Sequence, residues 1–271
     1  MLLRLYKPSP PLAPFIESYI VFEDDGSLKD LPMNIVPNGL PEIAVHYGDH
    51  CESHINYPGE VKGGYLYGPH NRPGFFRPRG RIKCLCVLFK PYGVFKIFGH
   101  PQVEFRNLAV NLEDICGIDG TDVIEKVALA KTPEEKALAM DSFLSCQYIK
   151  AVERSTDIDR ELVYIILTKG AVKIRDICKR MDVNIKTLER RFKYTLGLTP
   201  KEFATIIRIN HAYRLLKTND SNDIQDVVFE CGYYDQSHFI NDFKNLTRFT
   251  PDVLMKTSDA HVIYLNRIYT Y

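Results

Sequence analysis

Hydrophobic and polar residues alternate over much of the first hundred residues, which is the pattern of half-buried β-strands. Three segments with this alternation are predicted as strands: residues 11–23, 41–48 and 81–89. Glycine and proline gather in other stretches, which are predicted as loops: residues 36–41, 57–69 and 71–80. The pattern therefore predicts a β-rich domain at the start of the chain.

From about Leu108 the hydrophobic period lengthens and indicates helices. A short helix is predicted at residues 111–117, and two longer helices are predicted between residues 119 and 149. Thr132, Pro133 and Glu135 have the spacing of a capping box with proline in the first turn. The second long helix should therefore begin directly after Thr132.

The C-terminal half contains one pattern twice. Residues 174–200 and 224–251 each read as a short helix, a turn and a longer helix, and each ends in Thr-Pro. Residues 201–218 join the copies in one continuous helical pattern, opened by a capping box at Thr199 and Glu202. Two helix-turn-helix units on a joining helix suit the entry of two helices into successive major grooves of DNA.

The longer helix of the first copy has two unlike faces. Asn184 is the predicted N-cap, and four apolar residues share a face and are expected in the core: Ile185, Leu188, Phe192 and Leu196. On the opposite face Arg190 can bind guanine and Glu189 can accept a hydrogen bond from cytosine. The candidate DNA-binding residues of this copy are Lys186, Thr187, Glu189, Arg190 and Lys193.

In the second copy Asp235 is the predicted N-cap of the longer helix, with Phe239, Phe243 and Leu246 facing inward. The side chains offered to DNA are polar but uncharged at most positions. The candidates are Gln236, Ser237, His238 and Asn241. Gln and Asn can bind adenine in the major groove, whereas His238 can equally well cap the helix or pack against it.

Charge is distributed unevenly along the chain although the net charge is only +1. Residues 160–217 contain 14 Lys and Arg against 5 Asp and Glu, a net charge of +9. Residues 218–256 contain 3 against 7, a net charge of −4. Because contacts to phosphate supply most non-specific affinity for DNA, the first copy is expected to provide most of it.

Residues 157–256 resemble the DNA-binding module of AraC/XylS-type transcription regulators. The resemblance rests on the pattern L-x-R-x-F ending at Phe192, on GLTP, on R-x-x-x-A-x-x-L-L starting at Arg208, and on CGYYDQSHFINDFK followed by Thr-Pro. It implies seven helices with two helix-turn-helix units, and double-stranded DNA and RNA polymerase as partners. Asn241 stands where the family usually has a basic residue and Arg248 where it usually has glycine, so Arg248 must adopt another geometry or bear strain.

The N-terminal half resembles an uncharacterised domain that often precedes such modules, in the stretches at residues 31–49, 65–73 and 89–99 and in the predicted helix that begins at residue 111. Regulators of this type commonly carry a sensor or dimerisation domain here. The resemblance therefore implies a small-molecule effector or a homodimer. A regulator controlled without any effector, through its abundance or a protein partner, is the alternative.

Cations and aromatic side chains crowd one part of the N-terminal half, which suits a small anionic or aromatic ligand. The candidate ligand-binding residues are Tyr65, Tyr67, His70, Arg72, Phe75, Phe76 and Arg77. A basic loop surface is the alternative interpretation. His46, His50 and His54 recur every four residues, but they fall on a strand that runs into a turn, so their side chains should diverge. No metal site and no cofactor are predicted.

The sequence contains no motif typical of an enzyme and no segment typical of a membrane-spanning protein. It contains no nucleophile elbow, phosphate-binding loop or dinucleotide fingerprint, so no catalytic residues are predicted and the chain is not expected to be an enzyme. A DNA-repair methyltransferase with an AraC-type module would need a zinc-bound cysteine, and the seven cysteines lack clustered ligand spacing. Their scatter indicates a reducing cytoplasm, and no apolar run is long enough to cross a membrane.

Together these patterns predict an α+β chain with two domains. Residues 1–150 form a sensor or dimerisation domain, β-rich at first and helical from about Leu108, and residues 151–156 form a linker. Residues 157–256 form an all-α DNA-binding domain of about seven helices. Residues 257–271 are an aromatic C-terminal tail that either docks as an added strand or frays.

Overall fold

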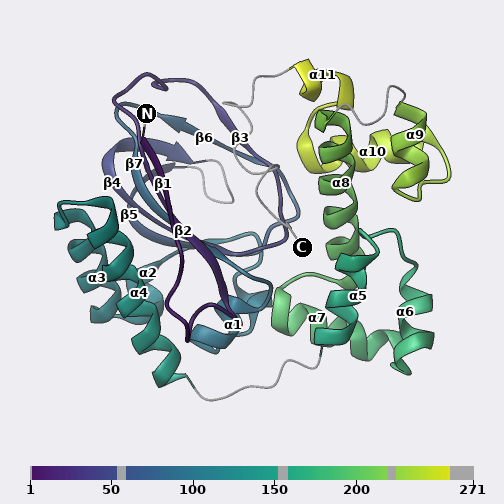
Figure 1. The fold of residues 1–271 in the computed structure, drawn as a ribbon, viewed down its shortest axis with the longest axis horizontal. Helices are drawn as coiled ribbons and strands as arrows, with labels where there is room; N and C mark the ends of the chain where they lie inside the picture. The colour runs from purple at the N-terminus through teal and green to yellow at the C-terminus, as the bar shows by residue number, and fades with distance from the viewer. Residues whose placement is uncertain (1, 54–58, 152–157, 219–223, 257–271) are drawn as a thin grey trace.

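The structure is a computed structural model that describes residues 2–53, 59–151, 158–218 and 224–256 (Figure 1). A body of strands with a few helices lies beside a purely helical body, with the chain passing once from the first to the second. Most of the predicted linker, the C-terminal tail and His54 lie outside the described residues.

Eight antiparallel strands form one sheet in the N-terminal body. The strands are β1 (Leu2–Tyr6), β2 (Ile16–Glu23), β3 (Met33–Ile35), β4 (Glu42–Ser53), β5 (Gly59–Tyr67), β6 (Gly74–Pro78), β7 (Lys83–Phe89) and β8 (Ala109–Asn111). Their order is β1-β2-β7-β4-β5-β8, while β6 pairs with β3 and with the far end of β4. The predicted strands at residues 11–23, 41–48 and 81–89 therefore correspond to β2, β4 and β7, and β4 extends further than predicted.

Two segments predicted as loops are strands, and this prediction was wrong. They are β5 and β6, whose glycines and prolines suggested turns. Gly64 is needed for close packing, because a Cβ there would lie 2.7 Å from Ile124 Cγ1. Gly63 has a φ of 87° and lies opposite His46, where the pairing of β4 with β5 becomes irregular. Glycine inside a strand often marks a close approach or a bulge of this kind.

Helices cover one face of the sheet (Figure 1). The helical segments of this body are α1 (Gly93–Phe98), the 3₁₀ turn η1 (Gln102–Glu104), α2 (Leu112–Cys116), α3 (Ile118–Leu129) and α4 (Pro133–Lys150), of which η1 contacts α7 rather than the sheet. The predicted capping box of α4 is confirmed, since Glu135 N–H donates to Thr132 Oγ1 at 3.1 Å and Thr132 N–H donates to Glu135 Oε2 at 3.1 Å. Val123 and Met140 from α3 and α4 pack with Val45 and Leu66 of the sheet in one core.

The C-terminal body consists of seven helices among the described residues, as predicted. They are α5 (Asp159–Leu167), α6 (Ile174–Met181), α7 (Ile185–Leu196), α8 (Pro200–Thr218), α9 (Ile224–Glu230), α10 (Gln236–Thr247) and α11 (Pro251–Lys256). The long helix α8 runs through the body, with α5 to α7 near one end and α9 to α11 near the other (Figure 1). Phe192, Phe203, Phe239 and Phe243 are fully buried in its core.

The two bodies share an apolar contact. Val36 of the N-terminal body belongs to the core of the C-terminal body, and a Cβ on Gly39 would lie 3.3 Å from the ring of Phe203. The rings of Phe95 in α1 and Tyr194 in α7 meet edge to face, with centroids 5.3 Å apart. None of the helices described is long and apolar enough to span a membrane.

Candidate nucleic-acid interface

Helix α7 is the candidate reading helix of the first unit, and its two ends are set by local interactions. The Asn184 side chain accepts the N–H of Lys186 at 2.9 Å, which confirms the predicted N-cap. Gly197 ends the helix with a φ of 72° and donates its N–H to Lys193 O at 3.0 Å. Capped at both ends, the helix is fixed in length and direction.

One face of α7 is buried and anchors it. Leu188, Phe192 and Leu196 are at most 3% exposed and pack in the C-terminal core. Ile185 was predicted to join them, but it is 44% exposed. The prediction for Ile185 was wrong. Its place in the helical period fits the buried face, but it is the first residue of the helix and lies beyond the end of that core.

The opposite face of α7 presents the residues predicted to contact DNA. Lys186, Arg190 and Lys193 are exposed, while Thr187 and Glu189 are partly buried. Four of the five predicted residues line one hollow on the surface, together with Tyr194 and with Val103 from η1: Lys186, Glu189, Arg190 and Lys193. The structure thus brings these four predicted residues together and places Val103 of the N-terminal body beside them.

Helix α10 is the corresponding helix of the second unit. Asp235 is its N-cap and accepts the N–H of His238 at 2.8 Å, while Phe239 and Phe243 are buried. The predicted residues Gln236, Ser237, His238 and Asn241 are all exposed. His238 also has partners within the protein: its Nε2 lies 3.5 Å from Asp242 Oδ2, and its ring meets Tyr233 edge to face at 5.2 Å. It is therefore less available than the other three.

Helix α8 connects the two units, and Arg208 on it binds both sides. Its guanidinium donates from Nε and Nη2 to Gly170 O, at 3.1 and 2.7 Å, just before the first unit. Its Cζ lies 4.9 Å from the ring centroid of Tyr233 in the second unit. Position 170 must be glycine, because a Cβ would lie 2.2 Å from Ala204 O. These contacts fix the two units on one rigid helix.

The seven residues predicted to bind a ligand do not form one cluster. Tyr65, Tyr67 and Phe76 lie together within a small second core, around His46. Phe75 and Arg77 alternate with the buried Phe76 along β6, and they contact each other with Arg77 Cζ 5.8 Å from the Phe75 ring. His70 is buried elsewhere, near Gly68, and Arg72 is exposed.

His46 belongs to the aromatic cluster but was not among the predicted ligand-binding residues. Its ring stacks on Phe76 with centroids 5.5 Å apart, and its Nε2 lies 3.3 Å from Tyr67 Oη. Burial lowers the pKa of His46 to about 4, so the ring is neutral at pH 7. Alternation along β4 and β5 could have revealed this neighbour, had β5 been recognised as a strand. His50 is exposed and lies near Glu60, so the two histidines diverge as predicted.

The part of the chain that the structure describes contains no group of three His, Cys, Asp or Glu side chains arranged to hold a metal ion. Cys84 and Cys86 lie with their sulfurs 3.8 Å apart on β7, where Cys84 is buried and Cys86 partly buried.

Comparison with known proteins bears on both halves. A helix-turn-helix domain model matches residues 177–257, and a model of a domain of unknown function (DUF6597) matches residues 4–111. The HTH-type transcriptional activator RhaS of Escherichia fergusonii is 25% identical over 171 residues, which are 61% of this chain and 58% of that protein. RhaS of Mannheimia succiniciproducens is 34% identical over 70 residues, 26% of each chain. The chain thus spans less than two thirds of these relatives.

Among solved structures, ToxT from Vibrio cholerae has a TM-score of 0.48 at 16% identity, covering 88% of this chain and 97% of that chain. The sequence matches confirm the resemblance of the C-terminal half. The chain therefore contains a helix-turn-helix domain, preceded by a domain of unknown function, and it is similar to HTH-type transcriptional activators.

Proposed function

We propose that the protein is a sequence-specific transcription regulator that binds double-stranded DNA through α7 and α10. The observation that carries the proposal is the pair of capped helices, each anchored by buried apolar residues and each exposing polar side chains, held on α8 by Arg208. A rigid joining helix sets the distance between two reading helices, as recognition of two successive major-groove segments requires.

The two helices have unequal roles in this proposal. On α7, Arg190 binds guanine, Glu189 accepts from cytosine, and Lys186 contacts guanine or phosphate. On α10, Gln236 and Asn241 read adenine. The first unit supplies most of the affinity, because residues 160–217 have a net charge of +9 and residues 218–256 one of −4.

The N-terminal domain is proposed to bind a small effector near His46, Tyr65, Tyr67 and Phe76, which the structure gathers in one cluster. A ligand there would act by favouring one arrangement of the two domains, which requires different affinities for the two arrangements. A thermal-shift screen tests this part, since a ligand of the native state raises its apparent stability. RNA polymerase and a second copy of the chain are further partners in the proposal, and the cytoplasm is its compartment.

The deciding experiment is the selection of genomic fragments by the purified full-length protein, with the Arg190→Ala variant beside it. We expect a discrete motif, and we expect the variant to bind that motif about 10- to 100-fold more weakly, because a bidentate contact to guanine contributes about 1–3 kcal/mol. Sequence-blind binding by the parent protein, with no loss in the variant, would contradict the proposal.

A further inference from the structure

The N-terminal domain touches the first helix-turn-helix unit beside its DNA-reading face. Val103 of η1 lines the same hollow as Lys186, Glu189 and Arg190. At the end of α7, a Cβ on Gly197 would lie 2.5 Å from Pro69 Cγ and 2.7 Å from Gln102 O. The N-terminal domain therefore follows α7 from its reading face to its last residue.

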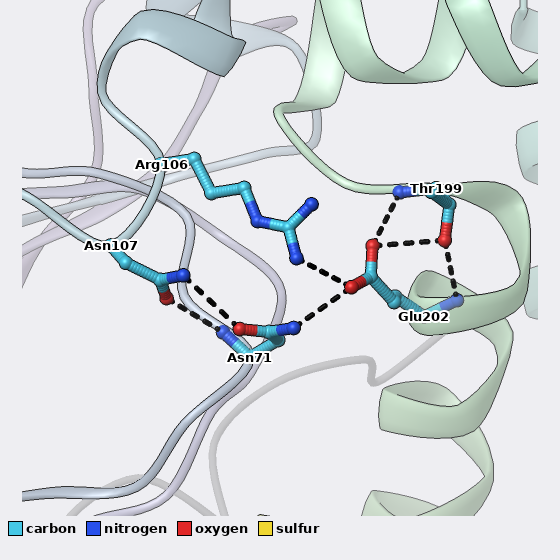
Figure 2. A network of polar contacts seen from close by, with 5 residues as sticks. All are labelled: Asn71, Arg106, Asn107, Thr199 and Glu202. Atoms are coloured by element: carbon cyan, nitrogen blue, oxygen red, sulfur yellow. Dashed lines mark hydrogen bonds and ion pairs between the residues drawn. The ribbon is translucent and has the colours of Figure 1, made fainter.

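A polar contact closes this interface at the junction of α7 and α8 (Figure 2). Glu202 Oε1 accepts a hydrogen bond from Arg106 Nη2 at 2.5 Å and another from Asn71 Nδ2 at 2.8 Å. Asn71 is itself held by Asn107, whose Nδ2 donates to Asn71 Oδ1 at 3.2 Å. We call the three residues Asn71, Arg106 and Glu202 the interdomain clasp.

The other oxygen of Glu202 belongs to the DNA-binding domain. Glu202 Oε2 accepts from Thr199 N and from Thr199 Oγ1, both at 2.9 Å, and Glu202 N–H donates to Thr199 Oγ1 at 3.1 Å, which completes the predicted capping box of α8. One carboxylate therefore caps the joining helix and holds the N-terminal domain. A change in the clasp acts on the short turn between the reading helix and the joining helix.

The ion pair of the clasp is half-buried, so solvent screens it less than it screens a typical surface pair. The side chains of Arg106 and Glu202 are only 26% and 27% exposed. Burial by itself raises the pKa of Glu202, but the bonds from Thr199 and the contact with Arg106 outweigh it and leave the pKa below its usual value. The carboxylate is ionised at pH 7, and opening the clasp loses its charge-assisted hydrogen bonds with Arg106 and Asn71.

A reading helix needs free space on both sides. The major groove is about 12 Å wide, and a helix with its side chains is about 10–12 Å across, so the phosphate backbones pass close to the helix. Val103 forms part of the wall of the hollow in front of Lys186 and Arg190. η1 therefore lies beside the side chains that a wall of the groove would have to approach.

We propose that the interdomain clasp is an autoinhibitory contact, which holds η1 beside the reading face of α7 and must open before α7 enters the groove. The inference rests on the proposed function, since it assumes that α7 reads DNA. In the closed arrangement the protein retains the exposed helix α10, whose residues carry less positive charge. Strong binding therefore depends on release of the first unit.

The first test measures opening without DNA. The chain contains no tryptophan, so Val103→Trp places a single fluorophore at the wall of the hollow. Adding Arg106→Gln in this background should shift the emission to longer wavelength, because the indole loses its contact with α7. Arg79→Gln is the matched control: it removes the same charge from an arginine that pairs with Asp30 and Glu52 within the N-terminal domain. It should leave the emission unchanged.

The second test measures affinity for the selected DNA fragment in proteins with Val103 intact. Arg106→Gln should bind at least about fivefold more tightly than the parent, the lower end of usual coupling between sites. Loss of a positive charge alone would weaken binding to phosphate, so tighter binding must come from release. Arg79→Gln should bind as the parent does, or slightly more weakly.

Two failures can be told apart. If the parent binds its motif through Arg190 but the Arg106→Gln protein neither shifts the emission nor gains affinity over Arg79→Gln, the clasp is not inhibitory. An emission shift without a gain in affinity has the same consequence, because the clasp then opens without controlling DNA. If Arg190→Ala leaves binding intact in both the parent and the Arg106→Gln background, the proposed function itself is wrong and autoinhibition falls with it.

Discussion

Arg248 ends α10 in a left-handed conformation. Its φ is 68°, and its N–H donates to Lys244 O at 2.8 Å. Gly197 ends α7 with a φ of 72° and the same type of hydrogen bond. Arg248 was expected either to adopt another geometry or to bear strain. It keeps the left-handed geometry that ends the helix, so it bears the steric cost of its Cβ.

Replacing Arg248 by glycine should therefore stabilise the C-terminal domain. We expect the free energy of unfolding to rise by about 0.5–1 kcal/mol, because relief of the strain exceeds the added entropy of the unfolded chain. Denaturant titration measures it. Arg248→Ala removes the same side chain but keeps the strain, so it should change stability much less; equal effects of the two substitutions would contradict the explanation.

His46 should make the stability of the N-terminal domain depend on pH. Burial lowers its pKa to about 4 in the folded protein, whereas the unfolded chain takes up this proton near pH 6.5. Between these values the unfolded state binds more protons, so stability falls as the pH falls. One such histidine removes about 1–1.5 kcal/mol between pH 7.5 and pH 5.5.

His46→Gln should flatten this dependence, since glutamine keeps a polar group near Tyr67 and does not titrate. His50→Gln is the control, because it makes the same substitution at a side chain that is 56% exposed. Thermal unfolding of each variant at pH 7.5 and pH 5.5 gives the comparison. The buried His70, whose pKa burial also lowers to about 4, should maintain part of the dependence in both variants.

At the scale of elements, α7 and α10 share an architecture but differ in charge. Lys186 and Lys193 are exposed on α7, and Lys244 is exposed on α10. We expect Lys186→Ala and Lys193→Ala each to reduce the slope of log affinity against log salt by about 1, one phosphate contact each. Lys244→Ala should reduce it less. A larger effect at Lys244 would show that the second unit dominates phosphate binding.

At the scale of the molecule, glycine is needed at position 197 for two reasons. Its backbone is left-handed, and a side chain there would collide with Pro69 and Gln102 of the N-terminal domain. Gly232 has a φ of 70° but meets only Ala171 of its own domain, with a Cβ distance of 3.1 Å. Gly197→Ala should therefore separate the unfolding of the two domains into two transitions. Gly232→Ala should cost about 1 kcal/mol without separating them. Calorimetry of the full chain distinguishes these outcomes.

Sequence alone determined most of the helical half. The caps at Asn184 and Asp235 and the periodic burial of Leu188 and Phe192 depend on residues two to four positions apart, so the sequence shows them directly. The repeat indicated two units, and their charges differ in the sequence itself. Ile185 was misplaced because the end of a core depends on its neighbours in space.

Tertiary structure decided the rest. Strands β5 and β6 depend on partners that lie far along the chain, and their glycines fit close contacts that local composition does not reveal. The cluster around His46 exists because β4, β5 and β6 bring its members together. Arg106 and Glu202 are 96 residues apart, and only the packing of the two domains turns a helix cap into a contact between them.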